Sequence, residues 1–217
     1  MSTISSLDPA AHSLERRGVA FAPEIARAAA KYGLDPVLLA AVAAQETGGP
    51  GSNAGRNILG DGGHGHGVFQ IDDRFHGFAR SAAAMDPAAN ADYAARMIAG
   101  LLKHYGGDVR EALSAYNAGS PNARGAVTAW QDGRQLGYAD SVLRHYASLA
   151  GETPQSLTHS LCAESLAEQR SVNALSSFAS LRPPLPSPSH HSWREIAGLD
   201  GSTGFGSIVD PDGVPSE

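Results

Sequence analysis

The sequence predicts a mainly α-helical domain, of the α+β class, with one small β element. Three observations predict this. Helix start signals recur along residues 20–150, one glycine-dense stretch interrupts them, and charge and proline content change beyond residue 150. The 217 residues are 42% hydrophobic, which is enough to supply a packed core. We therefore expect an N-terminal segment 1–20, a folded domain 21–150 and an acidic, proline-rich, partly disordered tail 151–217.

Two helices are expected in the first third of the domain. Pro23 is a suitable first-turn residue for a helix that ends at Gly33. Asp35 is a suitable N-cap for a second helix, because its side chain can accept a bond from a free N–H of the first turn. Apolar residues fill this second helix until residues 47–49, Thr-Gly-Gly, end it.

The later part of the domain repeats these signals. Asp86-Pro87 begins a helix that the glycines at 106–107 end, and Asp108 begins one that runs to Asn117 and is closed by Gly119. The periodicity of apolar residues predicts further helices over about 121–131 and 138–149. A weaker helical period covers 155–181, ahead of the proline-rich run 183–189.

The glycine-rich segment, residues 48–67, holds nine glycines. Glycine costs backbone entropy on folding, so a compact domain tolerates this density best where the backbone must approach something closely, such as a ligand. The apolar run Val68–Ile71 follows and predicts a short strand. We expect a glycine-rich loop and a small strand or hairpin between the helix that contains Glu46 and the later helices.

Charge and composition exclude several classes of protein. The net charge is −6, with −1 in residues 1–150 and −5 beyond, which argues against a nucleic-acid partner. The longest purely apolar run, Val37–Ala44, is too short to span a bilayer, so no integral membrane segment is expected. The single cysteine, Cys162, rules out an intramolecular disulfide framework. The first residues have no apolar core typical of a secretory signal.

Glu46 is the first candidate for chemistry. It lies in the last turn of a helix made almost entirely of Ala, Val and Leu. The negative end of the helix dipole and the apolar surroundings both disfavour the carboxylate, so both raise the pKa of Glu46 toward the range of a general acid. The alternative is a solvated glutamate at a helix end.

Two aspartates form the second candidate set. Asp61 lies among glycines and Asp72 follows the expected strand, in polar surroundings where each can stay ionised. The alternative for each is a turn aspartate that bonds to its own backbone. Together with Glu46 they make one protonated carboxyl and two ionised ones around the glycine-rich segment, which is the arrangement that glycoside hydrolysis uses.

Histidines and sugar-binding groups complete the candidates. His64, His66 and His76 could hold a metal, but the His-Glu-x-x-His pattern and a cysteine pair are both absent, so no metal and no cofactor are expected. Tyr116 and Asn117 end a helix, where core packing and capping are the alternatives. A flat phenol beside an amide is also what holds an N-acetylated sugar.

Taken together, these motifs resemble goose-type lysozymes and the wider group of lytic transglycosylases in the lysozyme superfamily. The match covers about residues 20–150 and depends on four pieces in order: residues 45–47, 60–76, 115–119 and 137–142. Thr47 stands where the family often has Ser. The chain is neither disulfide-bonded nor basic, so it resembles bacterial or phage members.

The resemblance implies a lysozyme-like, mostly helical fold with a cleft for a glycan strand. It implies Glu46 as the acid that protonates the glycosidic oxygen, and Asp61 and Asp72 as the carboxylates that activate a water on the opposite face of the sugar. It places five further residues near the saccharide: Gln70, His76, Tyr116, Asn117 and Tyr138. The aspartate next to Asp72 corresponds to a non-catalytic position.

The leading hypothesis is a muramidase that cuts the β-1,4 bond between N-acetylmuramic acid and N-acetylglucosamine by inverting hydrolysis. The alternatives are transglycosylation, which leaves 1,6-anhydromuramic ends, a non-catalytic glycan-binding module, and a metal-dependent hydrolase. We expect a monomer whose partner is the glycan strand and whose tail can dock a delivery or secretion partner. It is expected to act in the periplasm or cell wall after phage-type or specialised secretion.

Overall fold

The computed structural model describes residues 8–151 of the protein. The expectations for the tail, including the helical period over 155–181, the proline-rich run 183–189 and Cys162, lie outside the described residues. Within residues 8–151 the chain forms six α-helices and two small antiparallel sheets, so the mainly helical α+β class is confirmed. The helices are α1 (Pro9–Arg16), α2 (Ala22–Tyr32), α3 (Pro36–Ala43), α4 (Pro87–His104), α5 (Val109–Ala118) and α6 (Tyr138–Ala150).

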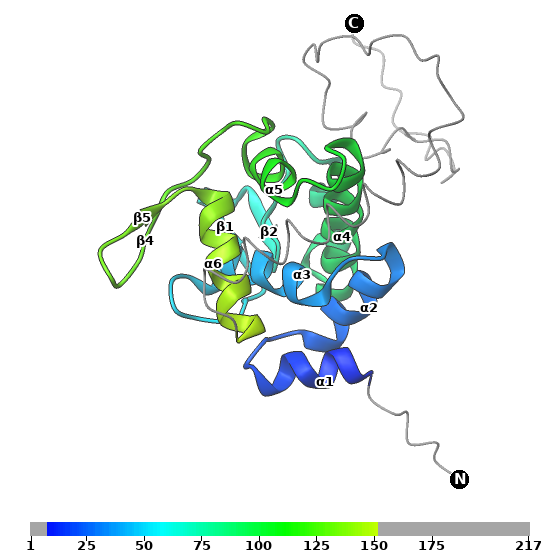
Figure 1. Ribbon diagram of the computed structural model, residues 1–217. Coiled ribbons are helices and arrows are strands. Elements are labelled where there is room, and N and C mark those ends of the chain that lie inside the picture. The colour runs from blue at the N-terminus through cyan, green and yellow to red at the C-terminus, as the bar shows by residue number, and fades with distance from the viewer. Residues whose placement is uncertain (1–7, 152–217) are drawn as a thin grey trace, which may run out of the picture.

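Helix α3 forms the centre of the core. Its residues from Leu38 to Ala43 are all buried, at 6% exposed or less, and it packs against α2 and α6. A helix that is apolar all round belongs inside a protein. The many buried alanines of α2, α3 and α4 let these three helices pack closely together (Figure 1). None of the described helices is long and apolar enough to cross a membrane.

The predicted helix starts are confirmed at Asp35, Asp86 and Asp108. Each side chain accepts a backbone N–H of its own first turn, at 2.8, 2.8 and 2.9 Å. Gly33 and Gly119 end α2 and α5 in the left-handed conformation, as predicted. Helix α1 lies in the segment 1–20, for which no helix was predicted, and packs on α2 through the buried Ala11 and Leu14.

A π-helical turn, Ala44–Gly48, continues α3 and is closed by a bond from the Gly49 N–H to the Ala44 carbonyl, 2.9 Å. Such turns recur at functional sites. The buried Thr47 holds it in place. Its hydroxyl accepts the Arg56 N–H at 2.8 Å and lies 3.0 Å from the Val68 carbonyl oxygen. The turn is thereby fixed to the neighbouring β element.

The small β element is a three-stranded antiparallel sheet in the order β1-β2-β3. Gly60 pairs with Gly65, and Gly65 pairs with Asp72. The strands are β1 (Ile58–Gly60), β2 (Gly65–Gly67) and β3 (Ile71–Asp72), and the short helical turns around them are η2 (Asp61–Gly63), η3 (Gly77–Arg80) and η4 (Ala82–Met85).

The prediction of a strand over Val68–Ile71 is wrong for its first three residues. They form the turn between β2 and β3, with left-handed backbone at Gly67 (φ 78°) and Gln70 (φ 48°). Asn90, fully buried on α4, accepts the Phe69 N–H at 2.8 Å and donates to the carbonyl oxygens of His66 and Ala84, both at 3.0 Å. The apolar side chains of the turn point into the core instead of alternating.

The predicted helix over 121–131 is also wrong. This region holds turns and the first strand of a hairpin, β4 (Thr128–Ala129) paired with β5 (Gln135–Leu136), which projects to one side of the molecule (Figure 1). Gly125 is left-handed (φ 64°), and Asn117 Oδ1 accepts the Ala126 N–H at 2.9 Å. These features favour an extended segment over the helix that the apolar spacing suggested. Helix α6 follows, close to the predicted range 138–149.

Candidate active site

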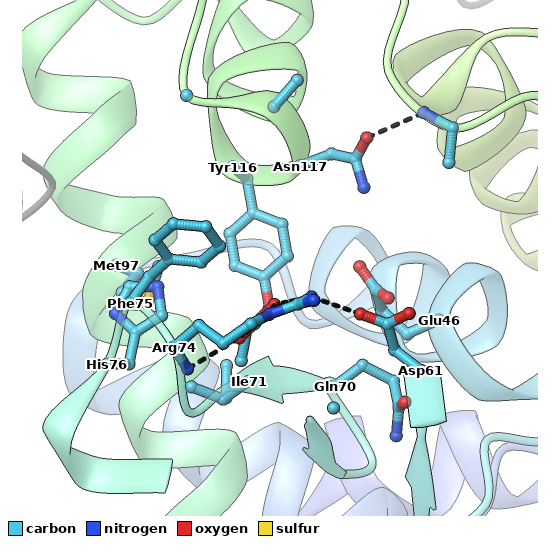
Figure 2. A pocket seen from close by; sticks show the side chains of 15 residues that line it. Glu46, Asp61, Gln70, Ile71, Arg74, Phe75, His76, Met97, Tyr116 and Asn117 are labelled. Atoms are coloured by element: carbon cyan, nitrogen blue, oxygen red, sulfur yellow. Dashed lines mark hydrogen bonds and ion pairs between the residues drawn. The ribbon is translucent and has the colours of Figure 1, made fainter. Parts of the chain in front are cut away.

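A cavity of about 690 Å³ opens between the π-helical turn, the β2–β3 region and the C-terminal end of α5. Figure 2 shows the side chains that line it. It collects most of the residues that the sequence singled out, from segments far apart in the chain: Glu46, Asp61, Gln70, Asp72, His76, Tyr116 and Asn117. One cavity therefore joins the three candidate carboxylates.

Glu46 enters this cavity from the π-helical turn, at the end of the apolar helix α3. It is only partly exposed. Burial raises the pKa of Glu46 from 4.5 to about 7, and a hydrogen bond from Tyr138 opposes part of that rise. A carboxyl with this pKa is about half protonated at neutral pH, so it can donate a proton there.

Tyr138 is the direct partner of Glu46. It begins α6, is 1% exposed, and its hydroxyl donates to Glu46 Oε1 at 2.5 Å. Tyr138 does not line the cavity but lies behind Glu46. Burial raises the pKa of the Tyr138 phenol well above 10, so this group stays a hydrogen-bond donor.

Tyr116 lies between Tyr138 and the cavity. Its ring is stacked against that of Tyr138 at a centroid distance of 6.3 Å, and its hydroxyl donates to the Phe69 carbonyl at 3.1 Å. Burial raises the pKa of Tyr116 as well. The ring is thus fixed from both ends and presents its partly exposed face to the cavity, where a sugar can rest on it.

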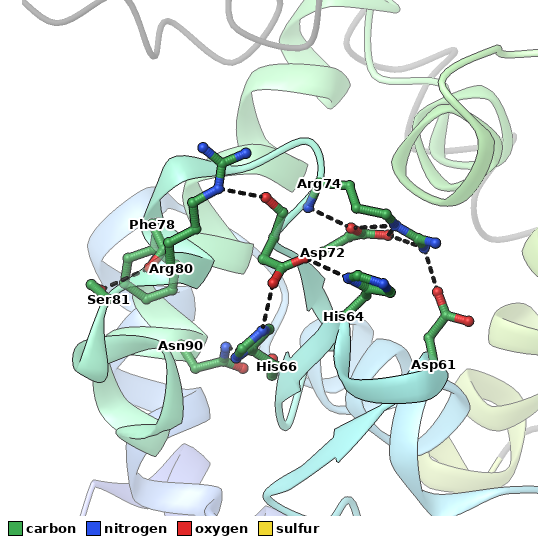
Figure 3. A network of polar contacts seen from close by, with 10 residues as sticks. Asp61, His64, His66, Asp72, Arg74, Phe78, Arg80, Ser81 and Asn90 are labelled. Carbon is green, nitrogen blue, oxygen red and sulfur yellow. Dashed lines mark hydrogen bonds and ion pairs between the residues drawn. The ribbon is translucent and has the colours of Figure 1, made fainter.

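Asp61 and Asp72 are joined by Arg74 (Figure 3). One terminal nitrogen of the guanidinium contacts Asp61 Oδ2 and also lies 2.5 Å from Asp72 Oδ2, while Arg74 Nε is 3.0 Å from Asp72 Oδ1. The backbone N–H of Arg74 also donates to Asp72 Oδ1 at 2.8 Å. These bonds lower the pKa of Asp72, so it is ionised at neutral pH.

The two aspartates differ in exposure. The Asp61 side chain is 64% exposed, and that of Asp72 is 22% exposed. Arg74 supplies one positive charge against their two negative charges. This wall of the cavity therefore carries a net negative formal charge, whereas burial favours the neutral form of Glu46.

The remaining sequence candidates occupy different places. Gln70 lines the cavity, and its amide donates to the carbonyl oxygens of Ile58 and Gly67 at 3.1 and 2.8 Å. His76 is 8% exposed, and its Nδ1 lies 3.1 Å from the Tyr93 hydroxyl. Burial lowers the pKa of His76. Asn117 is exposed, and its Oδ1 is used by the Ala126 N–H, which leaves its NH2 group open to the cavity.

Sequence reasoning gave no role to Phe75, and it did not foresee that Arg74 joins the two aspartates. Arg74 appeared in the sequence as one basic residue among several, and nothing indicated that it joins two acids 11 residues apart. Phe75 lines the cavity with a side chain that is 62% exposed. In the sequence, the signals for Phe75 were its place within the 60–76 motif and the two aspartates that lie two and three residues before it.

The three histidines do not meet as metal ligands. His64 and His66 both face Asp73, with His64 Nδ1 2.8 Å from Asp73 Oδ1 and His66 Nε2 3.5 Å from Asp73 Oδ2 (Figure 3). These contacts lower the pKa of Asp73. His76 faces Tyr93. Within residues 8–151, no group of three or more His, Cys, Asp or Glu side chains is placed to hold a metal ion.

Comparison with known proteins gives one match. A family model described as the transglycosylase SLT domain matches residues 23–135, about half of the chain. Searches of curated proteins and of solved structures find no significant match. The matched range contains Glu46, Asp61 and Asp72 and ends just before Tyr138.

Proposed function

Since the chain belongs to the transglycosylase SLT family, a family of peptidoglycan-cleaving enzymes, we propose that it cuts the β-1,4 bond between N-acetylmuramic acid and N-acetylglucosamine with Glu46 as general acid. The observation that carries this proposal is the raised pKa of Glu46, about 7, in the cavity that also holds the two aspartates. A general acid works best when its pKa lies near the working pH.

In this mechanism the Glu46 carboxyl gives its proton to the glycosidic oxygen as the bond to C1 of the muramic residue breaks. Glu46 is then a carboxylate in apolar surroundings, which is unfavourable without a partner. The Tyr138 hydroxyl, 2.5 Å away, supplies the hydrogen bond that stabilises it. Tyr138 is therefore a positioning residue for the acid.

We propose that water completes the reaction. Asp61 and Asp72 lie in the same cavity, and the bonds from Arg74 keep Asp72 ionised. An ionised carboxylate can orient a water molecule and accept its proton while the oxygen attacks C1 from the face opposite to the leaving group. Hydrolysis would then invert the anomeric carbon, as in glycosidases that hold a water between two carboxyl groups.

Transglycosylation is the second candidate, and two observations favour it. The family is described by that reaction, and both aspartates are already bound to Arg74. In this case the 6-hydroxyl of the muramic residue attacks its own C1. The Glu46 carboxylate takes the hydroxyl proton, and the product carries a 1,6-anhydro ring instead of a reducing end.

The test is digestion of purified peptidoglycan by wild type, Glu46→Gln and a control, Glu24→Gln, on the outer helix α2. We expect turnover by wild type and control and none by Glu46→Gln. Glycan binding should persist in Glu46→Gln, since that substitution keeps the shape of the side chain. Lysis by Glu46→Gln would refute the acid assignment, and absence of turnover in wild type would favour the non-catalytic binding module.

Mass spectrometry of the product ends separates the two enzymatic outcomes. Hydrolysis in heavy-oxygen water puts one labelled oxygen at each new reducing end. Transglycosylation leaves muramic ends that lack the label and are lighter than unlabelled hydrolytic ends by about 18 Da, the mass of one ordinary water. We expect labelled ends. We propose that the chain belongs to the goose-type subgroup, which the motifs at residues 60–76 favour. We also propose that it acts in the periplasm or cell wall, because the proposed substrate is peptidoglycan.

A further inference from the structure

Arg74 contacts the two aspartates of the cavity in unequal ways. Its side chain meets Asp72 through two nitrogens: Nε lies 3.0 Å from Oδ1 and 3.1 Å from Oδ2, and Nη2 lies 2.5 Å from Oδ2. The backbone N–H of Arg74 adds a bond to Asp72 Oδ1 at 2.8 Å. Asp61 is reached by Nη2 alone, through its Oδ2 (Figure 3). Asp72 is therefore the fixed end of this bridge, and Arg74 holds Asp61 by a single contact.

The oxygen atoms of the two carboxylates differ in what they can still bind. Each oxygen of Asp72 already accepts two bonds from Arg74. In the described part of the chain, Asp61 Oδ1 has no hydrogen-bond partner, and the Asp61 side chain is 64% exposed in the cavity wall. A carboxylate has about four acceptor sites, two on each oxygen. Of the oxygens of the two aspartates, Asp61 Oδ1 is thus the one most open to a water molecule.

The turn that carries Asp61 has few other restraints. In η2, Asp61 (φ 47°) and the glycines at 62 and 63 (φ 66° and 104°) all have left-handed backbone, and none of them is buried. Pairing of β1 with β2 fixes the ends of the turn, and the His64 N–H donates to the Asp61 carbonyl at 3.2 Å. Left-handed backbone costs free energy in a residue with a side chain, and glycine adds conformational freedom. The contact with Arg74 therefore restrains a turn that would otherwise be free to move.

The guanidinium of Arg74 is itself held at the cavity wall. Its Cζ lies 5.9 Å from the centre of the Phe75 ring, within the range of a cation–π contact. Both side chains line the cavity, and Figure 2 shows Arg74 extended across it to Asp61. An arginine suits this position because its planar group presents several N–H donors in a fixed geometry, whereas a lysine presents one compact ammonium.

We propose that Arg74 is a positioning residue that decides which nucleophile reaches C1 of the muramic residue, because it holds Asp61 Oδ1 where this oxygen can orient the attacking water. The inference rests on the proposed function. When the water is oriented, its oxygen forms the bond to C1 and its proton passes to Asp61 Oδ1. The bond from C1 to the glycosidic oxygen breaks as that oxygen takes the proton of Glu46. When the water is not oriented, the 6-hydroxyl, which the substrate itself holds near C1, attacks instead and gives its proton to the Glu46 carboxylate.

The experiment measures the ratio of labelled reducing ends to 1,6-anhydro ends after digestion of peptidoglycan in heavy-oxygen water. We expect Arg74→Gln to lower this ratio by about tenfold, the effect of losing one charge-assisted hydrogen bond on the hydrolytic branch alone. The matched control is Arg110→Gln, which breaks another exposed arginine–aspartate pair, with Asp140, outside the cavity. The control should keep the wild-type ratio. An unchanged or higher ratio in Arg74→Gln would overturn the proposal.

A double variant tests whether Arg74 acts through Asp61. Asp61→Asn should itself lower the ratio, because it removes the carboxylate that orients the water. If Arg74 serves only to place that carboxylate, Asp61→Asn combined with Arg74→Gln should give the same ratio as Asp61→Asn alone. A further fall in the double variant would show that Arg74 acts independently of Asp61, and would overturn the proposal.

A measurement without substrate separates positioning from catalysis. Backbone order parameters of Gly62 and Gly63, from NMR relaxation of the ligand-free chain, should fall in Arg74→Gln and stay constant in Arg110→Gln. Constant values in Arg74→Gln would overturn the proposal, since Arg74 would then not hold the turn. Only anhydro ends from wild type would refute the hydrolytic step of the proposed function, and this inference with it. Labelled ends from wild type with an unchanged ratio in Arg74→Gln would overturn this inference alone.

Discussion

Replacing Tyr138 by Phe should raise the pKa of Glu46 and shift the pH profile of the enzyme. The Tyr138 hydroxyl donates to Glu46 Oε1 at 2.5 Å and opposes the burial that raises this pKa. A hydrogen bond to a charged group contributes about 1.5–3 kcal/mol, and one pKa unit corresponds to about 1.4 kcal/mol. Loss of the bond should therefore raise the pKa of Glu46 by about one to two units, from about 7 to between about 8 and 9.

The assay is kcat for soluble glycan strands between pH 5 and 9. Since the protonated form of Glu46 is active, the wild-type rate should fall as the pH rises through about 7. In Tyr138→Phe this fall should move to higher pH, and the plateau below it should drop about tenfold, because the carboxylate formed during the reaction has lost its donor.

Tyr116→Phe is the matched control. It removes a hydroxyl from the stacked partner, but that hydroxyl donates to the Phe69 carbonyl and not to Glu46. The alkaline limb of its profile should stay where it is in wild type. A limb that stays in place in Tyr138→Phe, or moves to lower pH, would refute the assignment of Tyr138 as the donor that stabilises ionised Glu46.

Four further results are expected. Glu46→Gln should raise the free energy of unfolding at pH 8 by up to about 3 kcal/mol. Between pH 4.5 and 7 the native state binds more protons than the unfolded state, so the wild type loses stability as the pH rises through this range, and a glutamine at this position removes that loss. An unchanged urea midpoint would contradict this. Burial lowers the pKa of His145 from 6.5 to about 4, so its contribution to stability is present above pH 6.5 and lost as the pH falls toward 4. Urea unfolding of His145→Gln should lose this dependence, about 2 kcal/mol between pH 7 and 4.5, and an equal slope in both chains would count against it. Phe75→Ala should raise KM several-fold while Tm stays constant, because the side chain is 62% exposed in the cavity wall; Phe75→Trp should retain the wild-type KM, and a loss of Tm would point to a structural role. Arg74→Gln should bring the pKa of Asp72 back toward 3.8 and move the acid limb of the rate profile to higher pH, which an unmoved limb would rule out.

The helices could be predicted where a local signal decides them. Asp35, Asp86 and Asp108 cap the helices they were predicted to cap, because a short acceptor before a helical run satisfies an N–H wherever the helix lies. The two errors arose where tertiary bonds override periodicity. Asn90 folds residues 68–70 into a turn, and Asn117 holds Ala126 extended, and each of these bonds joins segments that are not adjacent in sequence.

In the candidate site, too, the sequence predicted the residues but not the contacts between distant segments. The residue types and their order were sufficient to nominate Glu46, Asp61 and Asp72, and the fold brings them to one cavity. Two contacts lay beyond reach of the sequence. Tyr138 is 92 residues from Glu46, and Arg74 joins two acids that lie in different elements, Asp61 in η2 and Asp72 in β3. No spacing rule reports such contacts.

The backbone at the cavity is less regular than the helices that support it. Three residues other than glycine have positive φ within the described range, and two of them, Asp61 (47°) and Gln70 (48°), line the cavity. Such backbone costs free energy and is kept where the surroundings fix it. Here the fixing groups are visible: Arg74 holds the Asp61 carboxylate, and two carbonyl oxygens hold the Gln70 amide. The alanine-rich core thus supports a site made from a π-helical turn and two left-handed residues, and this geometry is what sets three carboxyl groups around one cavity.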